Sequence, residues 1–158
     1  MRRADREVTD VNEIYDIIRG CDTCCIALNG EDGFPYVIPM NFGFEVNDGK
    51  PVIYLHCAKE GKKLDLIRDD GRCAFTMSRG HSLLLGKAAC ASAWLYESAC
   101  GRGHISIIEG DEGIKGLVAL MKKYDPDRVH VFDERHLKAV TMLRLDIEQL
   151  TGKRRQAK

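Results

Sequence analysis

The sequence predicts a mainly β (α+β) domain in which an antiparallel sheet or barrel carries helices at its ends. Strand-like segments dominate, and they follow one another without the regular βαβ alternation that builds parallel sheets. Asp48-Gly49 lies between two apolar runs, a pairing that strongly favours a β-hairpin. The chain has 158 residues and no repeat, linker or low-complexity segment divides it. We therefore expect a single domain over residues 1–158, with about six strands and two to four helices.

The first part of the chain predicts one helix followed by strands. Thr9 or Asp10 can cap a helix with a 3.6-residue apolar period, and Gly20 ends it. The apolar residues on one face of this helix are Val11, Ile14, Ile17 and Ile18. The other elements expected before the hairpin are a mobile arm at 1–7, a strand at 24–28 and a strand at 35–38.

The second part predicts further strands and two amphipathic helices. Cys73, Phe75 and Met77 alternate on one face of a strand, while Gly101 and Gly103 mark a kink or bulge in a later one. The expected elements are a helix at 62–68, a strand at 72–78, a loop at 79–90, a bent strand or strand pair at 91–109, a helix from Asp111 to Asp125-Pro126, a helical turn at 133–138, a strand at 139–147 and a mobile end at 152–158.

Composition excludes some classes of partner and site. Basic and acidic residues balance at 24 each, so no net field attracts nucleic acid or an anionic membrane. No apolar run approaches the ~20 residues that a membrane span needs, and no signal-peptide core follows the charged N-terminus. We expect a cytoplasmic protein that binds neither nucleic acid nor membrane. Its seven cysteines lack a second ligand pair at metal spacing, so we expect reduced thiols and no metal site.

A candidate anion site follows the hairpin. Its second strand leads into a short loop, and Gly61, Lys62 and Lys63 then open a helix. Cations at a helix N-terminus oppose the helix dipole, whereas a phosphate there would be stabilised by the dipole and by free backbone N–H groups. We therefore expect a phosphate ligand beside the two lysines. His56, at the end of the strand, is the nearest candidate for a polar contact to a bound ligand.

Five blocks of the sequence carry a family resemblance. They are RRADREVTD, GFPYVIPMNFGF, IYLHCAKEGKKLDLI, YESACGRG and EQLTGKRR, in that order across nearly the whole chain. The chain resembles the FMN-binding split-barrel proteins of the pyridoxamine 5'-phosphate oxidase-like superfamily. Within that superfamily it is similar to the nitroimidazole-resistance (Nim-type) flavoprotein branch.

The resemblance implies a six-stranded antiparallel split β-barrel that forms a homodimer with FMN at the subunit interface. It assigns FMN contacts as follows. The flavin ring lies along Val37, Ile38, Pro39, Met40 and Asn41, mainly through backbone groups; the cleft is lined by His56, Cys57 and Ala58; the phosphate is held by Lys62 or Lys63; and Ser98 approaches from a later strand. Ala99 stands where the family usually has valine, and residues 79–90 fit the family pattern poorly, which leaves open any substrate preference set there.

The implied activity is that of an FMN-dependent oxidoreductase. Electrons would pass from NAD(P)H through the flavin to a small acceptor such as a nitroimidazole or nitro-aromatic compound, and His56 is the candidate catalytic residue. Because a flavin supplies the reactivity, such a protein needs no acid–base dyad or catalytic triad of its own. An alternative is a non-catalytic flavin- or heme-binding protein on the same barrel, with His56, His104 or Cys57 as the axial ligand.

Overall fold

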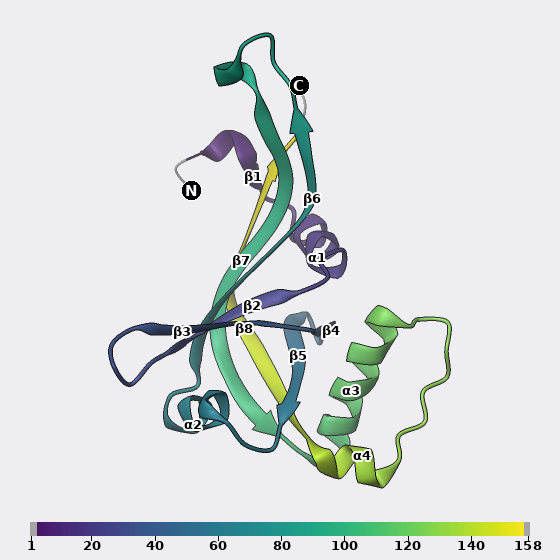
Figure 1. The fold of residues 1–158 in the computed structure, drawn as a ribbon. Helices are drawn as coiled ribbons and strands as arrows, with labels where there is room; N and C mark the ends of the chain where they lie inside the picture. The colour runs from purple at the N-terminus through teal and green to yellow at the C-terminus, as the bar shows by residue number, and fades with distance from the viewer. Residues whose placement is uncertain (1–2, 157–158) are drawn as a thin grey trace.

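The computed structural model describes residues 3–156, which form one antiparallel sheet with helices around it (Figure 1). The strands lie in the order β3-β2-β6-β7-β8-β5-β4, and β1 pairs with β8. The strands are β1 Glu7–Val8, β2 Cys24–Asn29, β3 Pro35–Met40, β4 Gly43–Asn47, β5 Lys50–Ala58, β6 Arg72–Leu84, β7 Ala93–Ile108 and β8 Val140–Arg155. The helices are α1 Val11–Arg19, α2 Lys62–Asp69, α3 Gly110–Tyr124 and α4 Glu134–Ala139, with short 3-10 turns η1 Ala4–Arg6 and η2 Ala89–Ala91.

The sheet curls into the predicted split barrel. Only Asn41 and Phe42 separate β3 from β4, yet these strands stand at opposite ends of the strand order. The sheet must therefore bend until its two edges meet at this corner, which is what closes a barrel. Residues 3–156 form eight strands rather than about six, because Glu7–Val8 adds β1 and because the first strand of the expected hairpin is divided. Its first half, β3, pairs with β2, and its second half, β4, pairs with β5.

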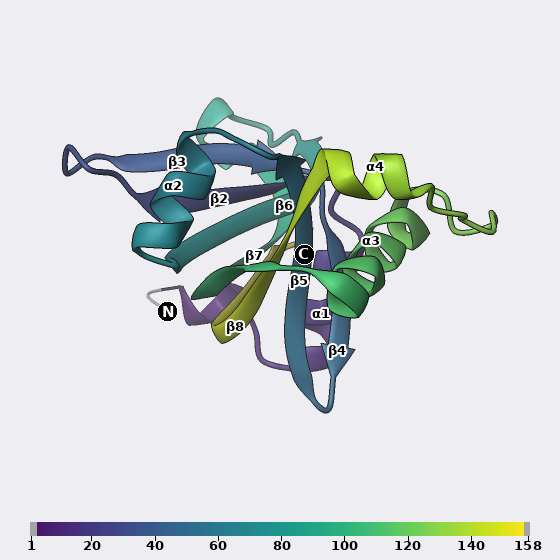
Figure 2. The same cartoon turned by 90° about the horizontal axis from the view of Figure 1, so that it is seen from below.

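The inward-facing side chains build one main core. On β6 the buried residues Cys73, Phe75 and Met77 alternate with exposed ones, as predicted. Helix α1 begins at its predicted cap, where Asp10 Oδ1 accepts a hydrogen bond from the backbone N–H of Asn12 at 2.8 Å, and it buries its apolar stripe. Helix α2 adds its three apolar residues to the same core, whereas α3 packs on the outside of β5 (Figure 2).

The predicted loop at 79–90 is wrong for its first half. Strand β6 continues to Leu84 and pairs with β7 across an irregularity between Arg79 and Ser82. Every residue from 80 to 91 is exposed, so this ribbon has no buried face to impose a period-two pattern on the sequence. Strand β7 is a single long strand rather than a pair, with its register shift beside the predicted Gly103.

The predicted mobile ends are paired where the structure describes them. Residues 7–8 form β1 against Gly152 and Lys153, and β8 runs on to Arg155. Gly152 permits this pairing because it has no side chain. A Cβ at this position would lie only 2.7 Å from Ile14 Cγ1. Residues 1–2 and 157–158 lie outside the described residues. Within the described range, no helix combines the length and apolar character needed to cross a membrane.

Candidate functional site

Strand β3 presents its residues in alternation. Val37 and Pro39 are exposed on the outer face of the sheet, while Ile38 and Met40 point toward the core. Asn41 follows the strand and is exposed. Since β3 is an edge strand that pairs with β2 alone among the strands of residues 3–156, one side of its backbone is left outside the ladder. Backbone groups of this edge are therefore open to a ligand.

The end of β5 divides its two central site residues between opposite faces. Cys57 packs against the main core, and His56 lies on the other face, which it shares with Tyr54. Burial lowers the pKa of His56, and the nearby charge of Lys63 lowers it further, so the imidazole is neutral at pH 7. Its Nδ1 atom is buried and has no hydrogen-bond partner among the described residues.

That orphaned nitrogen indicates a missing contact. A buried polar group without a partner costs about 1–3 kcal/mol, and buried groups in folded proteins are nearly always satisfied. A ligand beside His56 would supply the missing partner. The thiol of the adjacent Cys57 is unreactive. Burial raises its pKa, and the charges of Lys63 and Lys59 offset only part of that increase.

The first residues of α2 lie near both β3 and the end of β5. Gly61 precedes the helix with φ 135°, a conformation that favours glycine, and it provides no side-chain cap. The Lys62 ammonium lies 5.7 Å from the ring centroid of Tyr36 on β3. Lys63 is half-buried and lies close enough to His56 and Cys57 to lower the pKa values of both side chains. The structure thus brings β3, the end of β5 and both predicted lysines together.

Ser98 lies apart from this group within one chain. It stands on β7 directly between Ser78 of β6 and Lys153 of β8. Strands β2 and β6 separate β7 from β3, so three strand spacings, about 14 Å, lie between them. Ala99 is fully buried in the core, so its departure from the family's valine concerns core packing rather than the site.

The candidate axial ligands of the heme alternative are also separated. His56 pairs with Met142 on β8, whereas His104 pairs with Asp146 on the same strand. Four residues along a strand correspond to about 13 Å. One chain therefore does not place both histidines on a single porphyrin iron.

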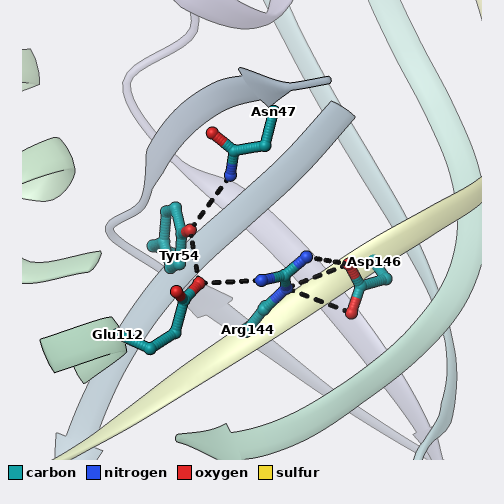
Figure 3. Close-up of polar contacts among 5 residues, drawn as sticks. All are labelled: Asn47, Tyr54, Glu112, Arg144 and Asp146. Carbon is teal, nitrogen blue, oxygen red and sulfur yellow. Dashed lines mark hydrogen bonds and ion pairs between the residues drawn. The ribbon is translucent and has the colours of Figure 1, made fainter. Parts of the chain in front are cut away.

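A polar network missed by the sequence analysis lies on the His56 face of β5 (Figure 3). The Tyr54 hydroxyl donates to Glu112 Oε1 at 2.7 Å and accepts from Asn47 Nδ2 at 3.2 Å. Arg144 Nη1 donates to the same carboxylate oxygen at 2.8 Å, and Arg144 also forms an ion pair with Asp146 at 2.7 Å. These contacts fasten the first turns of α3 to β4, β5 and β8.

We call Tyr54, Glu112 and Arg144 the brace, because the pKa shifts of Tyr54 and Glu112 keep their hydrogen bonds formed at neutral pH. Burial and the bond to Glu112 raise the pKa of Tyr54 to about 12, so its hydroxyl stays a donor. The bonds from Tyr54 and Arg144 lower the pKa of Glu112, so its carboxylate stays charged. The alternation of β5 could have indicated that Tyr54 shares a face with His56. Its partner Glu112, 58 residues away, had no sequence signal.

All seven cysteines are free thiols in this structure. Cys21, Cys24 and Cys73 are buried, and burial raises the pKa of the Cys21 thiol to about 11 and that of Cys73 to about 12. Such thiols are poor nucleophiles and poor metal ligands. In the part of the chain that the structure describes, no group of three or more His, Cys, Asp or Glu side chains gathers as a metal site.

Three cavities lie away from the predicted flavin residues. One of about 760 Å³ is bounded by the N-terminal segment, the β6–β7 ribbon and the end of β8. Another of about 420 Å³ adjoins the β5–α2 loop through Lys59 and α2 through Arg68. A third, of about 210 Å³, lies between α3 and β4. Residues predicted to contact FMN line none of these three.

A known family matches most of the chain. The model of the pyridoxamine 5'-phosphate oxidase family matches residues 10–154. The chain therefore belongs to the pyridoxamine 5'-phosphate oxidase family, in agreement with the resemblance drawn from its sequence. No curated protein sequence matches it.

Solved structures extend the comparison. The chain is 31% identical to a candidate 5-nitroimidazole antibiotic resistance protein from Bacteroides thetaiotaomicron, with a TM-score of 0.81 over 93% of this chain and 85% of that one. An FAD- and heme-binding protein from Mycobacterium smegmatis is 20% identical, with a TM-score of 0.83 over 96% of this chain and 74% of that one. A flavocytochrome from Azotobacter vinelandii is 17% identical, with a TM-score of 0.80 over 99% and 72%. The last two show likeness of fold alone.

Proposed function

We propose that this protein binds FMN along β3, the end of β5 and the start of α2. The observation that carries the proposal is that the start of α2 places Lys62 beside Tyr36 of β3 and Lys63 beside the orphaned imidazole nitrogen of His56. Lys62 and Lys63 match a phosphate, which the backbone N–H groups of the α2 N-terminus also favour. FMN ends in such a phosphate. Membership of the pyridoxamine 5'-phosphate oxidase family supports the same cofactor class.

Each part of the group has a distinct role in holding the cofactor. The outer surface of Val37, Pro39 and Asn41 offers a flat apolar and amide edge for the isoalloxazine ring, and Ile38 and Met40 contribute backbone groups. Cys57 and Ala58 form the adjacent wall. Burial, and to a smaller extent the charge of Lys63, lower the pKa of His56, so a bound phosphate would meet the lysines as its cations and a neutral imidazole.

We further propose that the protein is an FMN-dependent oxidoreductase. A bound flavin supplies the two-electron chemistry, and the chain has to bind, orient and polarise the reactants. His56, neutral and with Nδ1 lacking a partner in the described chain, is suited to hydrogen-bond the acceptor or the flavin edge. NAD(P)H is the proposed donor. The 31% identical Bacteroides protein supports a nitroimidazole or other nitro-aromatic acceptor.

We propose that two copies complete the site in a cytoplasmic homodimer. Ser98 is too far from the β3 edge in its own chain to share a flavin with it, about 14 Å by strand spacing. A second copy laid against the outer face of the sheet can supply Ser98 in trans. That face includes the small side chains of Ala27, Ala74 and Thr76, which allow close approach of another sheet.

The activity is tested by anaerobic reduction of the FMN-loaded protein. NADH or NADPH should bleach the flavin absorbance, and a nitroimidazole should restore it while being consumed. His56→Ala should reduce turnover at least about tenfold while FMN stays bound, since one hydrogen bond to a reacting group is lost. His81→Ala, at an exposed histidine on the β6–β7 ribbon, is the matched control. Loss of FMN from His56→Ala, with no separate effect on turnover, would contradict the catalytic role.

The second candidate is a binding protein without turnover, with flavin or heme as its ligand. The observation that favours heme is the neutral His56 with an unpartnered nitrogen, since imidazole in this state ligates iron. In that case the visible spectrum should be that of a porphyrin and should disappear in His56→Ala. A flavin spectrum that persists in His56→Ala but that no nicotinamide bleaches would instead indicate a flavin carrier.

A further inference from the structure

The cavity of about 420 Å³ lies at one end of β7 and β8, beside the β5–α2 loop. Its apolar floor includes Ile108 at the end of β7, Met142 near the start of β8 and Ile114 on α3. Small-molecule pockets usually span about 300–1,000 Å³ and combine an apolar lining with a few polar groups. The cavity has both the size and the apolar floor of such a pocket.

Its charged groups favour an anion. Lys59 and Arg68 enter from the β5–α2 loop and from α2, and Glu109 is the acidic residue among those that line the cavity. Arg68 already bonds Asp65 at 3.1 Å through Nη1, but a guanidinium has five N–H donors and can serve a second acceptor. The chain as a whole carries no net charge, so attraction of an anion to this cavity depends on these nearby basic groups.

The first turn of α3 adds to the same preference. Gly110 and Gly113 line the cavity, so backbone rather than side chains faces it there. The helix is 15 residues long, and its N-cap residue Glu109 makes no side-chain cap within the described structure. The positive end of the helix dipole therefore faces the cavity, but Asp111 and Glu112 in the first turn offset part of it, so Lys59 and Arg68 carry most of the preference for an anion. The hydroxyl of Thr141 supplies a further polar group in the lining.

We propose that this cavity binds a small molecule that joins an apolar body of one or two rings to a carboxylate or similar anionic group. The body packs on Ile108, Ile114 and Met142, and the anion meets Lys59 and Arg68. This site is separate from the proposed flavin site, because no residue assigned to FMN lines it. It is nevertheless adjacent, since Met142 is the cross-strand partner of His56.

The test uses 2-naphthoate as the probe and its neutral analogue 2-naphthamide as the ligand control. Isothermal titration of the purified full-length protein should give saturable binding of 2-naphthoate at one site per chain, with the amide at least about tenfold weaker. The double variant Lys59→Gln/Arg68→Gln should lose at least about tenfold in affinity, because two charge-assisted contacts are removed. Lys115→Gln, an exposed lysine of α3 outside the lining, should bind as the parent protein does.

A second variant tests the cavity by filling it. An ideal Cβ at Gly113 meets its nearest atoms at 3.7–3.8 Å, an ordinary contact, so Gly113→Leu can direct its longer chain into the cavity and should abolish binding. Circular dichroism checks that each variant is folded. Saturating FMN should leave the affinity for 2-naphthoate unchanged. The proposal is overturned if 2-naphthoate does not bind saturably, if the charge variant binds as tightly as the parent, or if FMN displaces the probe.

Discussion

Replacing Lys63 by glutamine should weaken FMN binding more than the same change at its neighbour Lys62. Lys63 is half-buried, and its charge acts on both His56 and Cys57, so it lies inside the proposed site. Lys62 is exposed, and its ammonium lies over the ring of Tyr36 at 5.7 Å. Water screens an exposed charge far more strongly than a half-buried one.

The two environments set the size of the effect. Unit charges 4 Å apart attract by about 1 kcal/mol in bulk water and about 4 kcal/mol at an effective dielectric constant near 20. Hydrogen bonds to charged groups contribute about 1.5–3 kcal/mol net. Lys63→Gln should therefore cost about 1.5–3 kcal/mol, or roughly tenfold to 150-fold in Kd, and Lys62→Gln about 1 kcal/mol, or roughly fivefold.

The assay is a titration of the apoprotein with FMN at low and at high salt, in which binding is measured by the quenching of the flavin fluorescence. Lys50→Gln, an exposed lysine of the β4–β5 turn, is the matched control and should leave Kd unchanged. Salt should reduce the effect at Lys62 more than at Lys63. A Lys63→Gln variant that binds FMN within twofold of the parent would refute the placement of the phosphate.

Three further predictions concern stability and pH. Tyr54→Phe removes a hydrogen bond to a charged carboxylate and should lower the free energy of unfolding in urea by about 1.5–3 kcal/mol. The control is Tyr36→Phe, whose hydroxyl makes no hydrogen bond within residues 3–156 and which should cost less than about 0.5 kcal/mol. Equal losses in the two variants would contradict a stabilising role for the Tyr54–Glu112 hydrogen bond. Gly43→Ala would place a Cβ 2.5 Å from the backbone N of Leu120, so it should lower the unfolding free energy by about 1–3 kcal/mol; an unchanged melting temperature would count against the observed packing of α3 on β4. Folding lowers the pKa of His56, so the unfolded chain binds more protons below about pH 6.5, and stability should fall as the pH drops through that range and level off below the folded pKa. His56→Gln should remove that part of the pH dependence in parallel unfolding curves, and identical curves would show that His56 does not cause it.

Local sequence signals predicted the elements with a strong pattern. The apolar period of α1 and its Asp10 cap, the alternation of β6 and the turn at Asp48-Gly49 all act over a few residues, so each could be found without the fold. The second half of β6 was missed because both its faces are exposed. The strand at 152–155 was missed because its stability comes from partners more than 50 residues away on β7.

The residues of the candidate site were likewise predicted where the sequence signal was local and missed where it was not. His56, Cys57 and the two lysines lie within eight residues of one another in the chain, so a single stretch could indicate them all. The brace of Tyr54, Glu112 and Arg144 unites three distant elements, and charged residues on helices and strands are ordinarily solvated. Only the fold shows that these three meet.

The visible spectrum of the freshly purified protein, recorded before and after FMN is added and the excess is removed, tests the central claim most directly. If β3, β5 and α2 hold a flavin, paired flavin bands should be present or should persist after removal of free FMN, at one FMN per chain. Lys63→Gln should retain less under the same wash. Failure to retain FMN, or a single intense porphyrin band in its place, would contradict the assignment of this site to FMN.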